Sequence, residues 1–86
     1  MKDNKKIIND LVRKFLRMKR IQANLRQVQV STKMGKAKQW TCEVESGRHQ
    51  ILTYDLIILC NIYGTSLSEL QDYITKEMYE NVEKQN

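Results

Sequence analysis

The chain contains no proline and only three glycines, Gly35, Gly47 and Gly64. Proline and glycine interrupt regular backbone more strongly than any other residue, so their scarcity favours long helices over short strands joined by many turns. A chain of 86 residues also has room for one domain with a modest core. We therefore predict an all-α single domain spanning residues 1–86, with its core in about residues 5–80.

Apolar residues recur every three or four positions over residues 4–22, which is the spacing of an amphipathic helix. The apolar stripe consists of Ile7, Ile8, Leu11, Val12, Phe15, Leu16 and Met18. The opposite face is basic and consists of Lys5, Lys6, Arg13, Lys14, Arg17 and Arg20. The pattern predicts a first helix over residues 4–22.

Two short helices are predicted next. Asn24 followed by Gln27 is a capping-box pattern, which predicts a helix over residues 25–33 that buries Leu25, Val28 and Met34. Gly35 allows a sharp turn. A further helix is predicted over residues 38–46, and Gly47 ends it.

The last two helices are also marked by their ends. Thr53 is the expected N-cap of a helix over residues 54–63, which Gly64 closes. Ser66 and Glu69 form a second capping-box pattern that opens a helix over residues 67–84. We expect residues 82–86 to fray. Five helices are therefore predicted.

Charge is divided unevenly along the chain. Residues 1–50 hold thirteen Lys or Arg and four Asp or Glu, a net charge of +9, whereas residues 51–86 hold two bases and six acids, a net charge of −4. This asymmetry suggests a polyanionic partner for the first part. Two ordinary solvated faces would give the same numbers, so composition alone leaves both interpretations open.

Several classes of function lack the residues they require. Cys42, Cys60 and His49 cannot assemble four zinc ligands, and no metal or cofactor is expected. No nucleophile pair and no phosphate-cradling glycine loop is visible, so an enzyme is not expected. The apolar runs are far shorter than the ~20 residues of a membrane span, and the start lacks a secretory signal. We expect a cytoplasmic protein with no membrane association.

The centre of the chain reads as a short helix, a glycine turn and a second short helix over about residues 25–46. In a helix-turn-helix, the second helix enters the major groove of DNA while the first crosses the backbone. Residues at the start of that second helix should present polar groups to base edges. Lys38, Gln39, Cys42 and Glu43 share one face, and Thr41 and Val44 lie on the opposite side.

These residues resemble the phage-repressor family of helix-turn-helix proteins, also called the Cro-like or xenobiotic-response-element family. The resemblance covers about residues 15–70 and lies in Leu25-Arg26-Gln27, Val30-Ser31, Gly35, Glu45-Ser46-Gly47 and the downstream LIILCNIYGTSLSEL. These matches share one register over more than fifty residues. The resemblance implies a five-helix, lambda-repressor-like DNA-binding domain.

The resemblance also implies roles for individual residues. Lys38, Gln39 and Glu43 match base-reading positions, and Cys42 shares their face. Phosphate contacts are expected from Arg26, Gln27, Lys36, Ser46 and Arg48, and Gln27 would also support the recognition helix. Arg20 matches an arginine that pairs with a glutamate at the end of the third helix, here Glu45.

The chain departs from the family pattern at three places. Ala37 stands where the family has a Ser or Thr N-cap, a loss of ~1 kcal/mol. Thr41 stands where the recognition helix has an apolar residue, and Trp40 beside it is the expected replacement in the core, although a contact with DNA is an alternative. The loop after the motif lacks the usual proline.

The sequence thus predicts a sequence-specific transcriptional regulator, a repressor that binds a two-fold operator of double-stranded DNA as a homodimer. Tyr73, Met78 and Tyr79 would form either a dimer surface or part of the core. One alternative is an antitoxin-like interaction protein that holds a small basic partner on its acidic last helix. Another is a basic surface that binds RNA or membrane.

Overall fold

The computed structural model describes residues 4–85, and all regular structure in that range is helical. The five helices are α1 (Asn4–Gln22), α2 (Gln27–Lys33), α3 (Trp40–Ser46), α4 (Thr53–Tyr63) and α5 (Leu67–Gln85). The predicted all-α, five-helix fold is confirmed. None of these helices combines the length and the apolar composition needed to cross a membrane.

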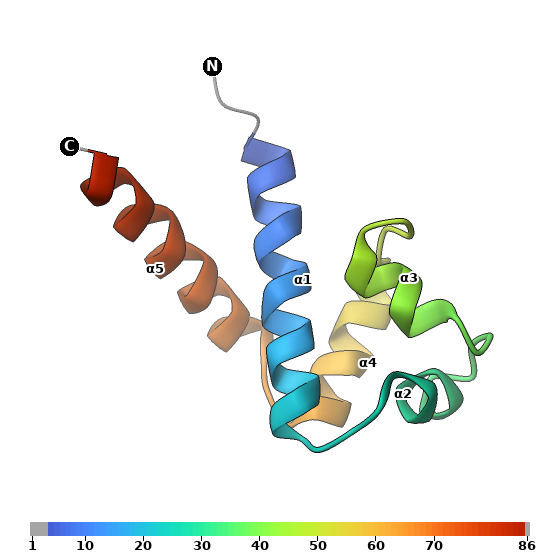
Figure 1. Ribbon diagram of the computed structural model, residues 1–86. Coiled ribbons are helices and arrows are strands. Elements are labelled where there is room, and N and C mark those ends of the chain that lie inside the picture. The colour runs from blue at the N-terminus through green and yellow to red at the C-terminus, as the bar shows by residue number, and fades with distance from the viewer. Residues whose placement is uncertain (1–3, 86) are drawn as a thin grey trace.

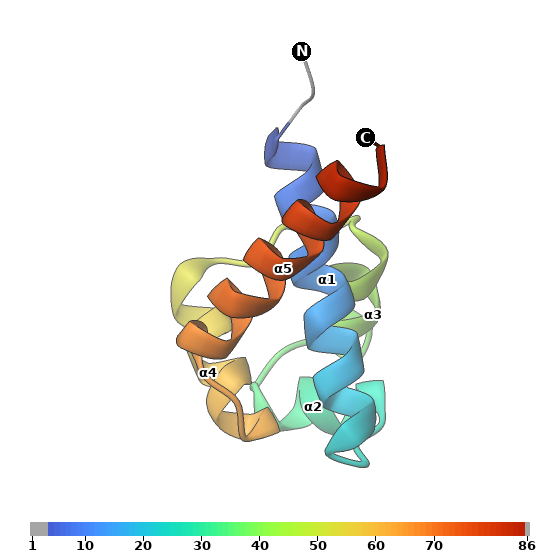
Figure 2. The same ribbon diagram turned by 90° about the vertical axis from the view of Figure 1, so that its left-hand side faces the viewer.

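Helix α1 is the central element of the fold. It packs against α3, α4 and α5, while α2 packs mainly against α3. Figure 1 shows α5 on one side of α1 and the group α2, α3 and α4 on the other. The view from the side of α5 shows that helix crossing α1 obliquely (Figure 2). The short helices α2 and α3 are therefore supported by α1 at the side away from α5.

The core forms where the apolar stripe of α1 meets the other helices. Its buried residues are Phe15, Leu16, Val30, Trp40, Val44, Leu59, Tyr63 and Leu70. Leu11, Phe15 and Leu16 confirm the predicted stripe of α1. Trp40 is buried as predicted, whereas Val28, which was expected to be buried, is 48% exposed. Val30 fills the core position of α2 instead.

The start of α2 differs from the prediction. Arg26, not Asn24, is the N-cap residue, and its backbone N–H donates to Oε1 of Gln29 at 2.8 Å. Asn24 instead adopts a left-handed conformation with φ of 59°. Asparagine tolerates this region better than most residues. Asn24 therefore turns the chain after α1, and the predicted Asn24–Gln27 cap is wrong.

Two further helix starts lie elsewhere than predicted. Helix α3 begins at Trp40, so Lys38 and Gln39 belong to the turn before it, in which the N–H of Trp40 donates to the carbonyl of Ala37 at 2.9 Å. Thr53 is the first residue of α4 rather than its cap, because extended Leu52 occupies the cap position. The N-cap residue depends on the backbone conformation in which the chain enters the helix, and the spacing of residue types in the sequence does not determine that conformation.

The remaining helix ends agree better with the sequence. Gly47 and Gly64 end α3 and α4 in left-handed conformations. Ser66 Oγ accepts a hydrogen bond from the N–H of Glu69 at 3.1 Å, as predicted. The backbone is helical to Gln85, beyond residue 82, where fraying was expected, and Asn86 lies outside the described residues.

The side chains of α5 divide between the core and the surface. The rings of Tyr73 and Phe15 lie 5.4 Å apart between centroids, so Tyr73 belongs to the α1–α5 contact. Met78 is half-buried, whereas Tyr79 is 66% exposed. The core position that was one of the two expectations therefore applies to Tyr73, and the surface position applies to Tyr79.

Candidate nucleic-acid interface

Helices α2 and α3 are joined by a pair of buried hydroxyl groups. Ser31 Oγ and Thr41 Oγ1 lie 2.7 Å apart, and the backbone N–H of Thr41 donates to Ser31 Oγ at 3.1 Å. Both residues are almost completely buried. The polar residue at the position where the resemblance implies an apolar one is thus satisfied by a partner on the preceding helix.

The same serine supplies what the start of α3 lacks. The first N–H groups of a helix have no partner within the helix and usually bond to an N-cap side chain. Helix α3 has no such side-chain cap, and its N-cap residue is Gln39, not Ala37 as predicted. Because Thr41 is the second residue of α3, Ser31 accepts from one of these N–H groups. Sequence reasoning missed this role, since the two residues are ten positions apart.

At the opposite end of helices α2 and α3 from the Ser31–Thr41 contact, a network of charged and polar side chains joins α3 to α1 and α2. Arg20 Nε lies 2.7 Å from Glu45 Oε2, and Arg20 Nη2 lies 3.1 Å from Glu45 Oε1. Gln27 Nε2 donates to the same Oε1 at 3.0 Å, and Arg20 Nη1 donates to the carbonyl of Leu25 at 2.8 Å. The structure therefore brings together the ends of α1 and α3 and the start of α2.

The charged groups of this network are largely buried, so their pairing matters for the stability of the fold. The Arg20 and Glu45 side chains are only 11% and 6% exposed. The hydrogen bonds to Glu45 raise the pKa of Arg20 above its ordinary value. A buried charge without its partner is strongly destabilising, so the two residues hold α3 to α1. Gln27, expected at a phosphate, donates to Glu45 in this arrangement.

Lys36 has a partner that sequence reasoning missed. Its Nζ lies 3.3 Å from the carboxylate of Asp55 and 5.6 Å from the centre of the Trp40 ring. Asp55 is 4% exposed and lies in the first turn of α4, where a negative charge is favoured by the helix dipole. Lys36 therefore ties the α2–α3 turn to α4. The sequence signal for Asp55 was a lone acid within an apolar helix.

The expected base-reading residues lie at one edge of the α2–α3 pair. Lys38 and Gln39 are exposed, and Cys42 and Glu43 are half-buried, whereas Thr41 and Val44 face the core. Within residues 4–79, the side chains of Lys38 and Gln39 form no hydrogen bond or ion pair. Their donors and acceptors are therefore available to an external partner.

The expected phosphate-binding residues Arg26, Ser46 and Arg48 lie near the end of α3, where Gln27 at the start of α2 contacts Glu45. Arg26 is exposed beside the start of α2. Arg48 Nε donates to Ser46 Oγ at 3.2 Å, and Ser46 Oγ donates to the carbonyl of Glu43 at 3.1 Å. His49, exposed beside Arg48, is held through its backbone N–H, which donates to the same carbonyl at 3.1 Å.

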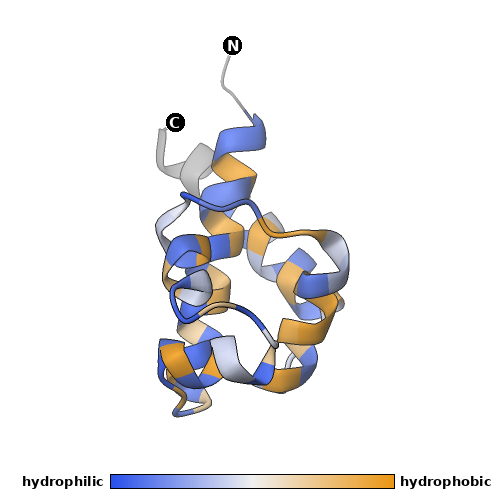
Figure 3. Cartoon of the chain, turned by 90° about the vertical axis from the view of Figure 1, so that its right-hand side faces the viewer, coloured by the Kyte–Doolittle hydropathy of each residue, from blue (hydrophilic) through white to orange (hydrophobic). Residues whose placement is uncertain are grey.

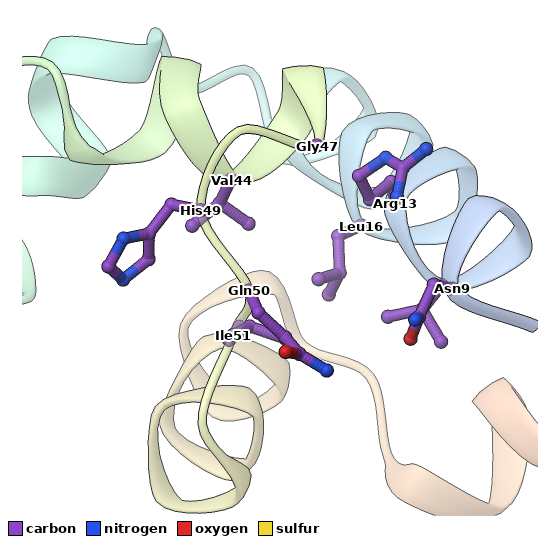
Figure 4. A pocket seen from close by; sticks show the side chains of 9 residues that line it. Asn9, Arg13, Leu16, Val44, Gly47, His49, Gln50 and Ile51 are labelled. Carbon is purple, nitrogen blue, oxygen red and sulfur yellow. The ribbon is translucent and has the colours of Figure 1, made fainter. Parts of the chain in front are cut away.

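A pocket of about 210 Å³ lies where α1 meets the end of α3 and the following loop. Figure 4 shows Asn9 and Arg13 on one side and Gln50 and Ile51 on the other, while the His49 ring points away from them. Arg13 also pairs with Asp10. A Cβ on Gly47, whose φ is 87°, would meet Cζ of Arg13 at 3.0 Å. The backbone at position 47 therefore favours glycine, and a larger residue would also displace the Arg13 guanidinium.

Basic residues of α1 lie beside one end of the α2–α3 pair. Lys14 and Arg17 are exposed on α1, and together with Arg13 they line a hollow that extends to Glu45 and Ser46. The basic face of α1 therefore adjoins the end of α3 that precedes Arg48. The exposed acids Glu69 and Asp72 lie on α5, at the opposite side of α1.

The cysteines do not form a metal site in the part of the chain that the structure describes. Cys42 and Cys60 are both free thiols, and no three potential metal-binding side chains gather within residues 4–79. Burial raises the pKa of the Cys60 thiol, which keeps it neutral in the core.

Comparisons of the chain with protein-family models, with curated proteins and with solved structures gave no match.

Proposed function

We propose that the chain is a sequence-specific DNA-binding regulator of the helix-turn-helix class, as its resemblance to the phage-repressor family implies. One observation carries the proposal. The pair of short helices, held together by hydrogen bonds and ion pairs, presents an edge containing Lys38 and Gln39, whose side chains have no partner within residues 4–79. Basic residues flank that edge on α1, α2 and the loop after α3.

The chemistry of this edge suits the major groove. The groove is ~12 Å wide and admits one helix. Lys38 would donate to guanine O6 and N7, Gln39 would pair with adenine, and Glu43 would accept from cytosine N4. Cys42 lies beside them on the same face. Lys38 and Gln39 would approach the bases from the turn that precedes α3.

Phosphate contacts would fix the register of the protein on the duplex. Arg26, before α2, and Arg48, after α3, would supply these contacts from the same end of the α2–α3 pair, and Ser46 adds a hydroxyl group beside Arg48. Gln27 and Lys36 already contact Glu45 and Asp55, so in this proposal they act chiefly by holding the α2–α3 pair in place.

As a repressor, the protein would act by occlusion. Two copies would place their α3 helices in successive major grooves ~34 Å apart on a two-fold operator. The bound dimer would then exclude other proteins from the overlapping DNA.

Selection of bound duplexes from a random pool tests the proposal. We expect enrichment of a palindromic consensus. Lys38→Ala should lose preference at one position of each half-site, whereas Lys76→Ala, which removes the same charge from the exposed side of α5, should return the original consensus. A pool without any enriched sequence would refute sequence-specific binding.

One observation favours a second candidate function, the capture of a small basic protein by α5. This helix packs mainly on α1, and its exposed side carries Asp72 and the 66% exposed ring of Tyr79. Co-purification of a small basic protein that Tyr79→Ala releases would support the antitoxin-like alternative. Unchanged recovery from the Tyr79→Ala variant would count against it.

A further inference from the structure

The outward face of α4 is an unusually apolar part of the surface. Nine large apolar side chains are exposed among the described residues, and four of them lie close together in the sequence on this face, namely Leu52, Tyr54, Ile57 and Ile58. The inward face, with Asp55, Leu59, Cys60 and Tyr63, is buried. Figure 3 shows α4 coloured largely as hydrophobic. The helix is therefore apolar on both faces, and the fold covers only one of them.

A soluble chain gains little from exposing several apolar residues together, and such patches mark interaction surfaces. Ile57 and Ile58 are 42% and 45% exposed. With Tyr54 and Asn61 they form a continuous stripe at the helical spacing of three and four residues. The stripe runs along most of the length of α4.

The absence of charged residues from this stripe bears on which partner can cover it. The chain carries a net charge of +5, so two copies repel each other wherever their basic surfaces meet. Helix α4 contains one charged residue, Asp55, which faces inward and pairs with Lys36. In a two-fold interface, a residue near the axis meets its own copy. An uncharged stripe is therefore suited to self-association.

We propose that the α4 face, Leu52, Tyr54, Ile57, Ile58 and Asn61, binds the same face of a second copy, with the two α4 helices antiparallel. This inference rests on the proposed function in one respect, because a two-fold operator needs two copies. It goes further by assigning the surface that joins them.

The position of α4 in the fold agrees with this role. Six residues, 47–52, connect α3 to α4, and an extended connection of that length spans at most ~20 Å. Packed helices lie ~8–10 Å apart. A central α4 pair therefore keeps the two α3 helices within reach of a ~34 Å separation. The distal half of α5, where Tyr79 is exposed, leads away from α3 (Figure 1).

Sedimentation equilibrium without DNA tests the proposal. The unaltered chain should be a dimer. Ile58→Glu and Ile58→Lys, placed near the middle of α4, should each raise the dimer dissociation constant by about 30-fold or more, the loss typical of a central interface residue. An equal mixture of these two variants should recover a dimer, because the glutamate of one copy then meets the lysine of the other.

A matched control exists on α1. Ile21 is 52% exposed, so Ile21→Glu makes the same chemical change on another surface and should leave the dimer intact. Circular dichroism checks that each variant is folded, and Ile57→Glu replaces Ile58→Glu should the latter unfold.

Three results would overturn the proposal: an unaltered chain that stays monomeric up to about 1 mM, a folded Ile58→Glu variant that remains dimeric, or a glutamate–lysine mixture that remains monomeric. Each differs from failure of the proposed function, because the measurement contains no DNA. A monomer that selects a single half-site would contradict the α4 interface and leave DNA binding intact.

Discussion

At the scale of single residues, Lys38 and Arg48 would make different contributions to DNA binding. Lys38 reaches the bases in our proposal, and Arg48 reaches phosphate. Lys38→Ala should therefore reduce discrimination at one base pair by ~1–3 kcal/mol. Arg48→Ala should weaken all duplexes alike and reduce the slope of log affinity against log salt by about 2, because the dimer loses one phosphate contact in each copy. Competition binding with single-base variants of the operator measures both, and equal losses on all duplexes with Lys38→Ala would exclude base reading by Lys38.

The hydroxyl pair between α2 and α3 leads to a prediction about stability. Ser31 Oγ contacts both the hydroxyl and the N–H of Thr41. Ser31→Ala leaves two buried polar groups without a partner and should cost about 2 kcal/mol of unfolding free energy. Thr41→Val leaves the rest of the serine contact in place and should cost about 1 kcal/mol. Urea denaturation measures both, and a larger cost for Thr41→Val would contradict the capping role of Ser31.

At the scale of the helices, the two glycines that end α3 and α4 form a natural comparison. Both have positive φ, but a Cβ would contact Arg13 at Gly47 and nothing within 4 Å at Gly64. Gly64→Ala should cost about 1 kcal/mol for the backbone alone. Gly47→Ala should cost more, because Arg13 must also move. Equal losses of unfolding free energy would show that the Arg13 contact contributes nothing.

The contact between α1 and α5 should depend on pH. The hydrogen bond from Lys19 is the main cause that lowers the pKa of Glu69. A carboxyl whose pKa is lower in the folded state stabilises the fold above its unfolded pKa and loses this contribution as pH falls through the folded value. Stability should therefore decline in acid, below about pH 5.

The variant Glu69→Gln should show a shallower acid decline than the unaltered chain. Asp72→Asn is the matched control, because Asp72 is exposed on the same helix and forms no ion pair within the described residues. Urea midpoints measured between neutral and acid pH provide the comparison. Identical profiles for Glu69→Gln and the unaltered chain would exclude the Lys19–Glu69 contribution.

Much of the element order could be predicted from local pattern. The recurrence of apolar residues such as Leu11, Phe15 and Leu16 predicted α1, and glycine positions marked the ends of α3 and α4. The wrong caps, Asn24 and Thr53, depend on the direction in which the chain enters each helix. The Lys36–Asp55 contact could not be predicted, because it joins the α2–α3 turn to α4 through space. Local spacing carries no record of such contacts.

At the scale of the whole molecule, the charge asymmetry coincides with the arrangement of the helices. The basic residues of α1, α2 and the loop after α3 surround the candidate interface, whereas the exposed acids Glu69 and Asp72 lie on α5, across α1. The uncharged outward face of α4 belongs neither to the basic surface nor to the acidic surface. A dimer joined through α4 would therefore carry two basic surfaces and would keep its acidic helices apart from them.

This arrangement makes the salt dependence of DNA binding a test of the entire assembly. Arg26 and Arg48 supply two cations per copy to the candidate DNA interface, so a dimer that neutralises about four phosphates should show a slope of about −4 in log affinity against log salt. The Ile58→Glu variant, bound as a monomer, should show about half that slope, while Ile21→Glu should retain it. Fluorescence anisotropy over a salt series measures the slopes. If monomeric Ile58→Glu showed the same slope as the unaltered chain, one copy would make all the phosphate contacts. A slope near zero for the unaltered chain would exclude phosphate binding altogether.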